Sequence, residues 1–539
     1  MGHEVKAEAV ARRSLVGTMS LISRFTLLSR VLGLARDQLF AALVGAGQGM
    51  HADAFVTAFR IPNLLRDLFA EGALSAAFVP VYARSLKGEG RAEAQRLAAR
   101  MMTLVAVVLV GLVALGFALS THVVHWLSPG FSAVPGKTDL AVLLTRIMLP
   151  FLPLVSLAAV MMGMLNAEER YGPPAIAPAL FNLAALAVGA SLWIARLPPE
   201  QVVLGWAIGT LVGGAAQLAI QVPELRRLGW RFRFDWAPSD PRVRQILWLM
   251  APATIGLAAV QLNIFIGSSL ASHEQGAQLW LQNAFRILYL PIGLFGVAIG
   301  TLSATGSALR VASGDIDGLR RSMRDALRLL AFLTIPATAG LMVLAEPIVR
   351  LLFEHGRYRP ADTQATALAL VYYSLGLVAY TAVKVLAPAF YSLGSARVPL
   401  LGSVTAVATS VALMYANYAW AGWGVVALGT TAGAFVNVAI LLAVYERRIG
   451  GLRERTLLRG LMTMVAASAV MAVCCWASLR GRERVCGVHG FSAQLATGLA
   501  PVLLGIAVYL TLAKWWRIGE ADAVLALIER RAVRTGKGE

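Results

Sequence analysis

The sequence has 539 residues, of which 58% are hydrophobic and only 14% are charged, and its formal net charge is +19. This composition is too apolar for a soluble globular protein and is typical of a polytopic membrane protein, so the positive charge is not read as a nucleic-acid-binding surface. The three cysteines, Cys474, Cys475 and Cys486, fit neither a disulfide framework nor a metal-ligand spacing, and we expect no metal and no cofactor.

Fourteen segments are candidate membrane helices, since a span needs about 20 mostly apolar residues. In chain order they lie near 15–45, 52–83, 100–120, 139–166, 175–195, 202–221, 245–271, 277–309, 327–353, 364–393, 398–417, 424–445, 457–478 and 493–514. Spans one, two and eight exceed the thickness of a bilayer, so we expect kinks near Pro62 and Pro291. The pattern predicts an all-α membrane protein of about 14 spans, with the first span retained.

Basic residues gather in alternate connections between the spans. The clusters are Arg84, Lys87, Arg91, Arg96 and Arg100; Arg226, Arg227, Arg231 and Arg233; Arg310, Arg320, Arg321 and Arg324; and Arg447, Arg448, Arg453 and Arg455. Because cytoplasmic loops are enriched in lysine and arginine, both termini are predicted to be cytoplasmic and the number of spans even. The other connections have fewer basic residues, among them Lys137 and the group Arg480, Arg482 and Arg484.

A short repeat relates the two halves of the chain. The sequence Ala-Phe-Arg-Ile at 58–61 recurs at 284–287, and the same shift carries Arg84 onto Arg310. An even number of spans separates the matching elements, so the halves share an orientation, as in transporters built from parallel repeats. We therefore predict an N-terminal lobe at 1–225, a C-terminal lobe at 226–450, and an added helix pair with a tail at 451–539.

Four arginines are predicted to lie within the membrane. At 1.5 Å per helical residue, Arg36 and Arg286 lie roughly 14 Å from the outer surface, Arg66 roughly 20 Å and Arg30 roughly 22 Å. An arginine at the centre of a span costs about 2.5 to 3.5 kcal/mol, so these side chains are expected to face a hydrated cavity or an anion. Phosphate is a suitable anion, because the planar guanidinium can donate two parallel hydrogen bonds to it.

Internal charge pairing is the alternative explanation. Asp53, Arg60 and Asp67 are spaced by seven residues, as are Arg30 and Asp37, so each set falls on one helical face where carboxylates could neutralise arginines. For Arg60 both interpretations stay open.

Other polar residues give weaker signals. Lys384, deep in span ten, could equally contact a substrate or pair internally, and His51 is most simply a solvated loop residue. The chain has no HExxH motif, nucleophile elbow or paired catalytic carboxylates, so nothing supports an enzymatic activity.

Four stretches make the sequence recognisable: SRVLGLARD at 29–37, ADAFVTAFRIPNLLRDLFAEGALSAAFVPVY at 52–82, PPAIAPALFN at 173–182 and KVLAPAFYSLGSARVP at 384–399. Together they resemble the bacterial lipid II flippase family called MurJ or MviN, over spans one to twelve. The resemblance implies a fourteen-helix inner-membrane protein with two six-helix lobes. It also implies that the added helix pair forms a groove for an undecaprenyl tail, and that lipid II, an undecaprenyl-pyrophosphate-linked peptidoglycan precursor, is the transported partner.

The motifs of that family also assign candidate substrate-binding residues. The resemblance implies this role for Arg30, Arg36, Asp37, Asp53, Arg66 and Arg286, with Arg60 and Lys384 as further candidates. The same superfamily contains polysaccharide-lipid flippases and multidrug extruders. The arginines disfavour an extruder of cationic drugs, whereas only the family motifs disfavour the polysaccharide flippase. Coupling to an ion or to the membrane potential stays open.

Overall fold

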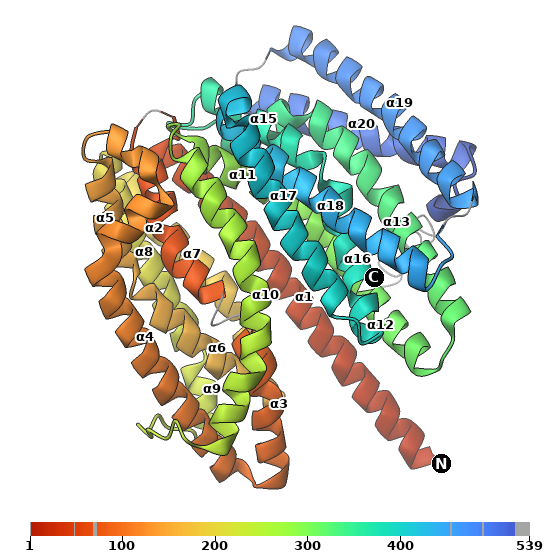
Figure 1. Ribbon diagram of the computed structural model, residues 1–539. Coiled ribbons are helices and arrows are strands. Elements are labelled where there is room, and N and C mark those ends of the chain that lie inside the picture. Colours follow the sequence, from red (N-terminus) through yellow and green to blue (C-terminus); the bar gives the residue numbers. More distant parts are fainter. Residues whose placement is uncertain (1, 48, 68–72, 453–454, 488–489, 523–539) are drawn as a thin grey trace. The chain divides into compact units, whose positions relative to one another are not determined.

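The computed structural model describes residues 2–47, 49–67, 73–452, 455–487 and 490–522, and all regular structure within these ranges is helical (Figure 1). The predicted all-α class is confirmed. By its contacts the chain divides into two compact units, Met1–Gln278 with Gly356–Tyr358, and Leu279–His355 with Arg359–Glu539. The three-part division predicted from the repeat stays a prediction.

The first unit contains ten α-helices and one 3-10 turn among its described residues. They are α1 (Gly2–Val44), α2 (His51–Arg66), α3 (Ala73–Gly88), α4 (Arg91–Leu127), η2 (Pro129–Ala133), α5 (Lys137–Met148), α6 (Phe151–Ala167), α7 (Gly172–Ile194), α8 (Pro199–Ala219), α9 (Val222–Arg227) and α10 (Pro241–Ala271). Helix α1 packs along α7, and α2 packs on α5. A core around Phe78, Met101 and Met164 joins α3, α4 and α6.

The second unit contains the remaining helices. They are α11 (Ala277–Pro291), whose first two residues belong to the first unit, η3 (Ile292–Gly296), α12 (Val297–Ala312), α13 (Ile316–Val343), α14 (Ala345–Phe353), α15 (Pro360–Ser374), α16 (Leu377–Ser392), α17 (Arg397–Ala421), η4 (Gly422–Gly424), α18 (Val425–Arg448), α19 (Arg455–Cys486) and α20 (Phe491–Trp515). Helix α17 packs on α18, and α19 packs on both α20 and α13. Buried side chains such as Phe332, Met471 and Tyr509 form the core between α13, α19 and α20.

Nine helical segments of the described residues are long and apolar enough to cross a membrane. A tenth is added if α15 and α16, which meet at a 42° bend, form one span. The multi-pass membrane class is confirmed, while the number 14 stays a prediction. Helix α1, which has 43 residues, is not among the nine.

Of the two kinks expected at prolines, the one near Pro291 coincides with a change of helix type, and the one near Pro62 stays a prediction. Helix α2 continues through Pro62 and ends at Arg66, and residues 68–72, in the middle of the predicted second span, lie outside the described residues. In the predicted eighth span, α11 ends at Pro291 and is followed by a π-helical turn over Ile292–Gly296. A proline removes one backbone donor and its ring clashes with the preceding turn, so Pro291 weakens the end of α11.

A charged cap fixes the start of α10. The Asp240 carboxylate accepts hydrogen bonds from the backbone N–H groups of Arg242 at 2.7 Å and Val243 at 3.4 Å, and it also contacts the Arg100 guanidinium. Burial favours the neutral acid, but the hydrogen bonds from Arg242 and Arg100 outweigh it and hold the pKa of Asp240 below its ordinary value. The start of α10 is thereby tied to α4 within the first unit.

Candidate functional site

Arg36 and Asp37 form an ion pair in the middle of α1. Two N–H groups of Arg36 donate to the same oxygen, Asp37 Oδ1, from Nε at 3.1 Å and from Nη2 at 2.8 Å. Both side chains are largely buried, with 14% and 10% of their surface exposed. Because a guanidinium carries five N–H donors, this contact leaves three donors of Arg36 for a ligand.

Helix α7 supports this pair from the side. The Arg36 guanidinium lies 5.5 Å from the centre of the Phe181 ring, close enough for a cation–π contact. Next to it, the Asn182 side-chain amide donates to the Ser29 carbonyl oxygen at 3.0 Å, and Asn182 also approaches Gly33. Two stretches that identify the family, 29–37 and 173–182, therefore pack against each other.

A second pair of the same kind ends α2. Arg66 donates from Nε at 3.2 Å and from Nη2 at 2.9 Å to Asp67 Oδ1, and the pair is more accessible than the one on α1. The Gln261 amide of α10 donates to the other oxygen of Asp67 at 3.4 Å. Thus α10 positions the carboxylate, and the carboxylate positions the arginine.

Asp53 is enclosed within the protein in this structure. Its carboxylate is 0% exposed and accepts hydrogen bonds at 2.8 Å from Lys137 Nζ and from the Gly276 backbone N–H. Lys137 is itself buried, and its ammonium lies 4.3 Å from the centre of the Phe131 ring. The predicted loop lysine is therefore the partner of Asp53, and in this conformation a ligand has no access to the carboxylate.

A polar network continues from Asp53 one helical turn further along α2. The Thr57 hydroxyl donates to Gln278 Oε1 at 2.6 Å, and the Gln278 amide donates to the Ser128 hydroxyl at 3.0 Å. Thr57, Ser128 and Gln278 are all buried. Together with the Asp53 pair, these bonds hold the start of α2, the residue after α4, and Gly276 with the first residues of α11 in one arrangement.

In the second unit, Arg286 is half-buried on α11. Its neighbour Phe285 lies in an aromatic group, with ring centres 5.3 Å from Tyr373 and 6.4 Å from Tyr380. Lys384 is exposed on α16.

The remaining candidates on α1 and α2 are more accessible. Arg30 is exposed and Arg60 is half-buried. The seven-residue spacing suggested that Asp37 would neutralise Arg30 and that Asp53 and Asp67 would neutralise Arg60. In the structure these carboxylates contact Arg36, Lys137 and Arg66 instead.

Sequence reasoning missed three residues of this region. Phe181 and Asn182 lie inside a stretch quoted for the resemblance, which was the available signal. Lys137 was noted only as a loop cation, and no local pattern links it to a carboxylate 84 positions earlier. Among the residues that the structure describes, no group of three or more histidine, cysteine, aspartate or glutamate side chains is arranged to hold a metal.

Comparison with known proteins gives a consistent result. The family model described as "Lipid II flippase MurJ" matches residues 40–497. A probable lipid II flippase MurJ of Rhizobium meliloti is 33% identical over 96% of this chain and 97% of its own length. A lipid II flippase MurJ of Burkholderia cenocepacia is 33% identical over 84% of this chain and 86% of its own length.

Solved structures share the fold. A lipid II flippase MurJ in an inward closed conformation superposes with a TM-score of 0.77 at 23% identity, covering 92% of this chain and 99% of that one. An inward-facing multidrug resistance transporter of the MATE family reaches a TM-score of 0.66 at 15% identity, covering 79% and 96%. At these identities the structural likeness shows the fold alone.

Proposed function

The chain belongs to the MurJ family of lipid II flippases, and from this we propose that it moves lipid II between the leaflets of a bacterial inner membrane, from the cytoplasmic to the periplasmic side, by alternating access. The observation that carries the proposal is the family match over residues 40–497 together with the arginine pairs on α1 and α2. Both termini are cytoplasmic in this proposal, which rests on the alternation of basic loops.

The chemical task is to carry a pyrophosphate through a low-dielectric layer. A charged group that leaves water loses its hydration, at a cost of several kcal/mol unless other donors replace it. We propose that Arg30, Arg36 and Arg66 of the first unit donate hydrogen bonds to this pyrophosphate. We propose separately that Arg286, on the second unit, is a further substrate-binding residue. The half-buried Arg36 is suited to the task because Asp37 fixes its guanidinium while leaving donors for the cargo.

The paired carboxylates set the affinity in this mechanism. Without cargo, Asp37 and Asp67 neutralise Arg36 and Arg66, so these two arginines are not bare cations in the empty site. An arriving pyrophosphate uses the donors that remain on these guanidiniums, whose charge the carboxylates already partly neutralise, and the nearby carboxylates repel it. Binding is therefore weaker than unpaired arginines would give, which favours release on the far side.

Asp53 and Lys137 have a different role in this proposal. Because both side chains are fully buried and paired, we propose that they stabilise the packing of α2 on α5 rather than contact the cargo in this conformation. Contact of Asp53 with a substrate would require this packing to open.

The alternative functions predict a different ligand. A multidrug extruder shares the fold, but the arginines of α1 and α2 outnumber the aspartates of these helices, and this excess of positive charge disfavours a cationic drug. A competition assay separates the two: short-chain pyrophosphate analogues should displace lipid II from the purified protein, and quaternary ammonium drugs should not. Displacement by the drugs alone would favour the extruder.

Substitution of the arginines tests the site. Arg36→Lys and Arg66→Lys keep the charge but lose the planar fork, so lipid II exposure on the outer surface should fall about tenfold while the protein still inserts. Arg84→Lys is the matched control, because Arg84 is exposed on α3 and its Nε donates only to the Pro80 carbonyl oxygen among its described contacts. Cells depleted of their own flippase and complemented with each variant provide the assay.

Alanine variants of the same arginines separate cargo binding from a purely structural role. If Arg36→Ala, Arg66→Ala and Arg286→Ala show normal lipid II exposure at normal membrane abundance, the arginines do not bind the cargo. If abundance and exposure fall in parallel, charge pairing alone explains these residues. Arg60→Ala, measured in the same way, decides between the two interpretations left open for Arg60.

A further inference from the structure

The arginine group near the end of α19 has no role in the mechanism above. Helix α19 buries one face, including Met464, Met471 and Cys475, against α13 and α20. Its opposite face is exposed along its length, for example 65% at Met462 and 64% at Val473. Exposed apolar side chains on a helix of a membrane protein are expected to face lipid.

This exposed face forms one stripe that changes from apolar to basic. Steps of three or four residues, or of eight, keep the members on one side of the helix. In order they are Leu458, Met462, Val465, Val473, Trp476, Arg480 and Arg484. Arg480 lies roughly 33 Å along the axis from Leu458, about the thickness of the hydrocarbon layer. The two arginines are thus placed where lipid phosphates lie, and Trp476 is one turn deeper, in the interfacial zone preferred by tryptophan.

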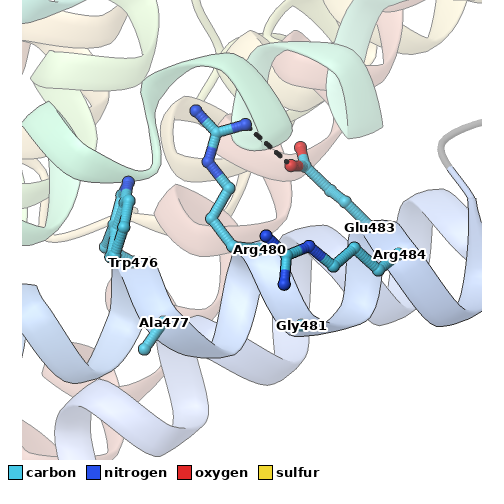
Figure 2. A pocket seen from close by; sticks show the side chains of 6 residues that line it. All are labelled: Trp476, Ala477, Arg480, Gly481, Glu483 and Arg484. Carbon is cyan, nitrogen blue, oxygen red and sulfur yellow. Dashed lines mark hydrogen bonds and ion pairs between the residues drawn. The ribbon is translucent and has the colours of Figure 1, made fainter.

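A hollow separates these side chains. It has a volume of about 620 Å³ and is lined by Trp476, Ala477, Arg480, Gly481, Glu483 and Arg484. Figure 2 shows Arg480 rising from the helix beside the hollow, and Arg484 extending along the helix with its guanidinium toward Arg480. A Cβ atom at Gly481 would meet nothing within 4 Å, so this glycine leaves room between the two arginines.

The charges in the hollow leave it positive. Glu483 pairs with Arg480 at 3.5 Å and lies 4.0 Å from Arg350 of α14, which Glu346 and Glu354 also contact, so among the residues that line the hollow two arginines face one carboxylate. Within the part of the chain that the structure describes, Arg484 contacts no carboxylate. An anion that enters the hollow therefore meets one unneutralised guanidinium and one that is only partly neutralised.

We propose that this hollow binds the phosphate group of an anionic diacyl lipid whose acyl chains lie along the apolar stripe of α19. The chemistry required is present on one continuous face: two arginines for the phosphate, a tryptophan at interfacial depth, and an apolar stripe whose nearer half, about 15 Å long, matches the chains of one leaflet. This site lies on the lipid-facing side of α19 and uses none of the residues assigned to the flipping reaction.

The test measures lipid binding directly. Full-length protein purified in detergent is incubated with phosphatidylglycerol or phosphatidylcholine, and bound lipid is counted by native mass spectrometry. Arg480→Gln combined with Arg484→Gln should weaken phosphatidylglycerol binding roughly 30-fold, on the basis of about tenfold per 1.4 kcal/mol and about 1 kcal/mol for each arginine near a charged surface. Phosphatidylcholine binding should not change.

Two further variants distinguish a binding site from a simple membrane anchor. Gly481→Leu fills the hollow without altering any charge and favours the helix, so it should also weaken phosphatidylglycerol binding. Arg447→Gln combined with Arg448→Gln removes the same charge from the end of α18 and should leave this site unaffected.

Three results would overturn the proposal. The first is unchanged phosphatidylglycerol binding in the Arg480 and Arg484 double variant. The second is unchanged binding in Gly481→Leu, which would leave the arginines as interfacial anchors only. The third is stronger retention of undecaprenyl phosphate than of phosphatidylglycerol with the same arginine dependence, which would make the ligand a prenyl lipid.

Discussion

Replacement of Lys137 by methionine probes the buried ion pair and, with it, the role of Asp53. The substitution removes the cation and leaves the Asp53 carboxylate with the Gly276 N–H as its remaining partner at 2.8 Å. Both members of the pair are at most 1% exposed, so solvent does not screen the loss. Breaking a buried pair in this way costs about 3 to 5 kcal/mol, equivalent to about two to three and a half powers of ten in the ratio of folded to unfolded protein.

The measurement has two parts, membrane abundance and the midpoint of thermal unfolding in detergent. Lys137→Met should lower both, whereas Lys87→Met, a control at an exposed lysine on α3, should lower neither. Combining Lys137→Met with Asp53→Asn should cost less than the sum of the single changes, because the double variant leaves no buried charge unpaired. A wild-type unfolding midpoint for Lys137→Met would refute the reasoning.

Three further predictions concern other parts of the first unit and its orientation. Gly45→Ala should destabilise the protein by about 1 to 2 kcal/mol, seen as a lower thermal midpoint, because Gly45 has φ +76° and a Cβ there would lie 2.7 Å from the Arg357 carbonyl oxygen. The folded pKa of Asp240 lies below its unfolded value, so its contribution to stability is present above about pH 4 and is lost as the pH falls through the folded pKa. In Asp240→Asn, the stability of the protein should therefore decrease less steeply as the pH is lowered below about 4. In intact spheroplasts an impermeant thiol reagent should label Ser132→Cys and not Gly88→Cys, both at exposed positions, and the reverse pattern would invert the topology.

Composition and periodicity predicted the helices well wherever a helix is mainly a membrane span. The predicted segments 424–445 and 493–514 correspond to α18 (Val425–Arg448) and α20 (Phe491–Trp515). The segment 327–353 instead covers the end of α13 and all of α14. Hydropathy detects only apolar side chains, whereas a helix continues wherever its backbone hydrogen bonds are satisfied. A hydropathy pattern therefore does not predict charged helical turns such as the start of α13.

The arginines could be located from the sequence, but their partners could not. Spacing by seven shows only that two backbone positions lie on one face of a helix. A long arginine side chain can fold onto the residue beside it, as Arg36 does onto Asp37 and Arg66 onto Asp67. Whether an arginine pairs with the adjacent carboxylate or with one seven residues away depends on side chains of other helices, such as the Phe181 ring beside Arg36. These neighbours are known only from the three-dimensional structure.

The segment Gly356–Tyr358 belongs to the first unit although it lies about 80 residues beyond the rest of that unit. The Arg357 N–H donates to the Ala42 carbonyl oxygen at 2.8 Å, and a Cβ at Gly356 would clash with the same carbonyl. At the usual 5 to 20 residues per second, the ribosome needs roughly 4 to 16 s to make those residues. Until residues 356–358 are synthesised, the amino-terminal helices lack this hydrogen-bond partner for the Ala42 carbonyl oxygen. A stalled or truncated chain would keep this part of α1 uncovered, and we expect it to be more sensitive to membrane proteases.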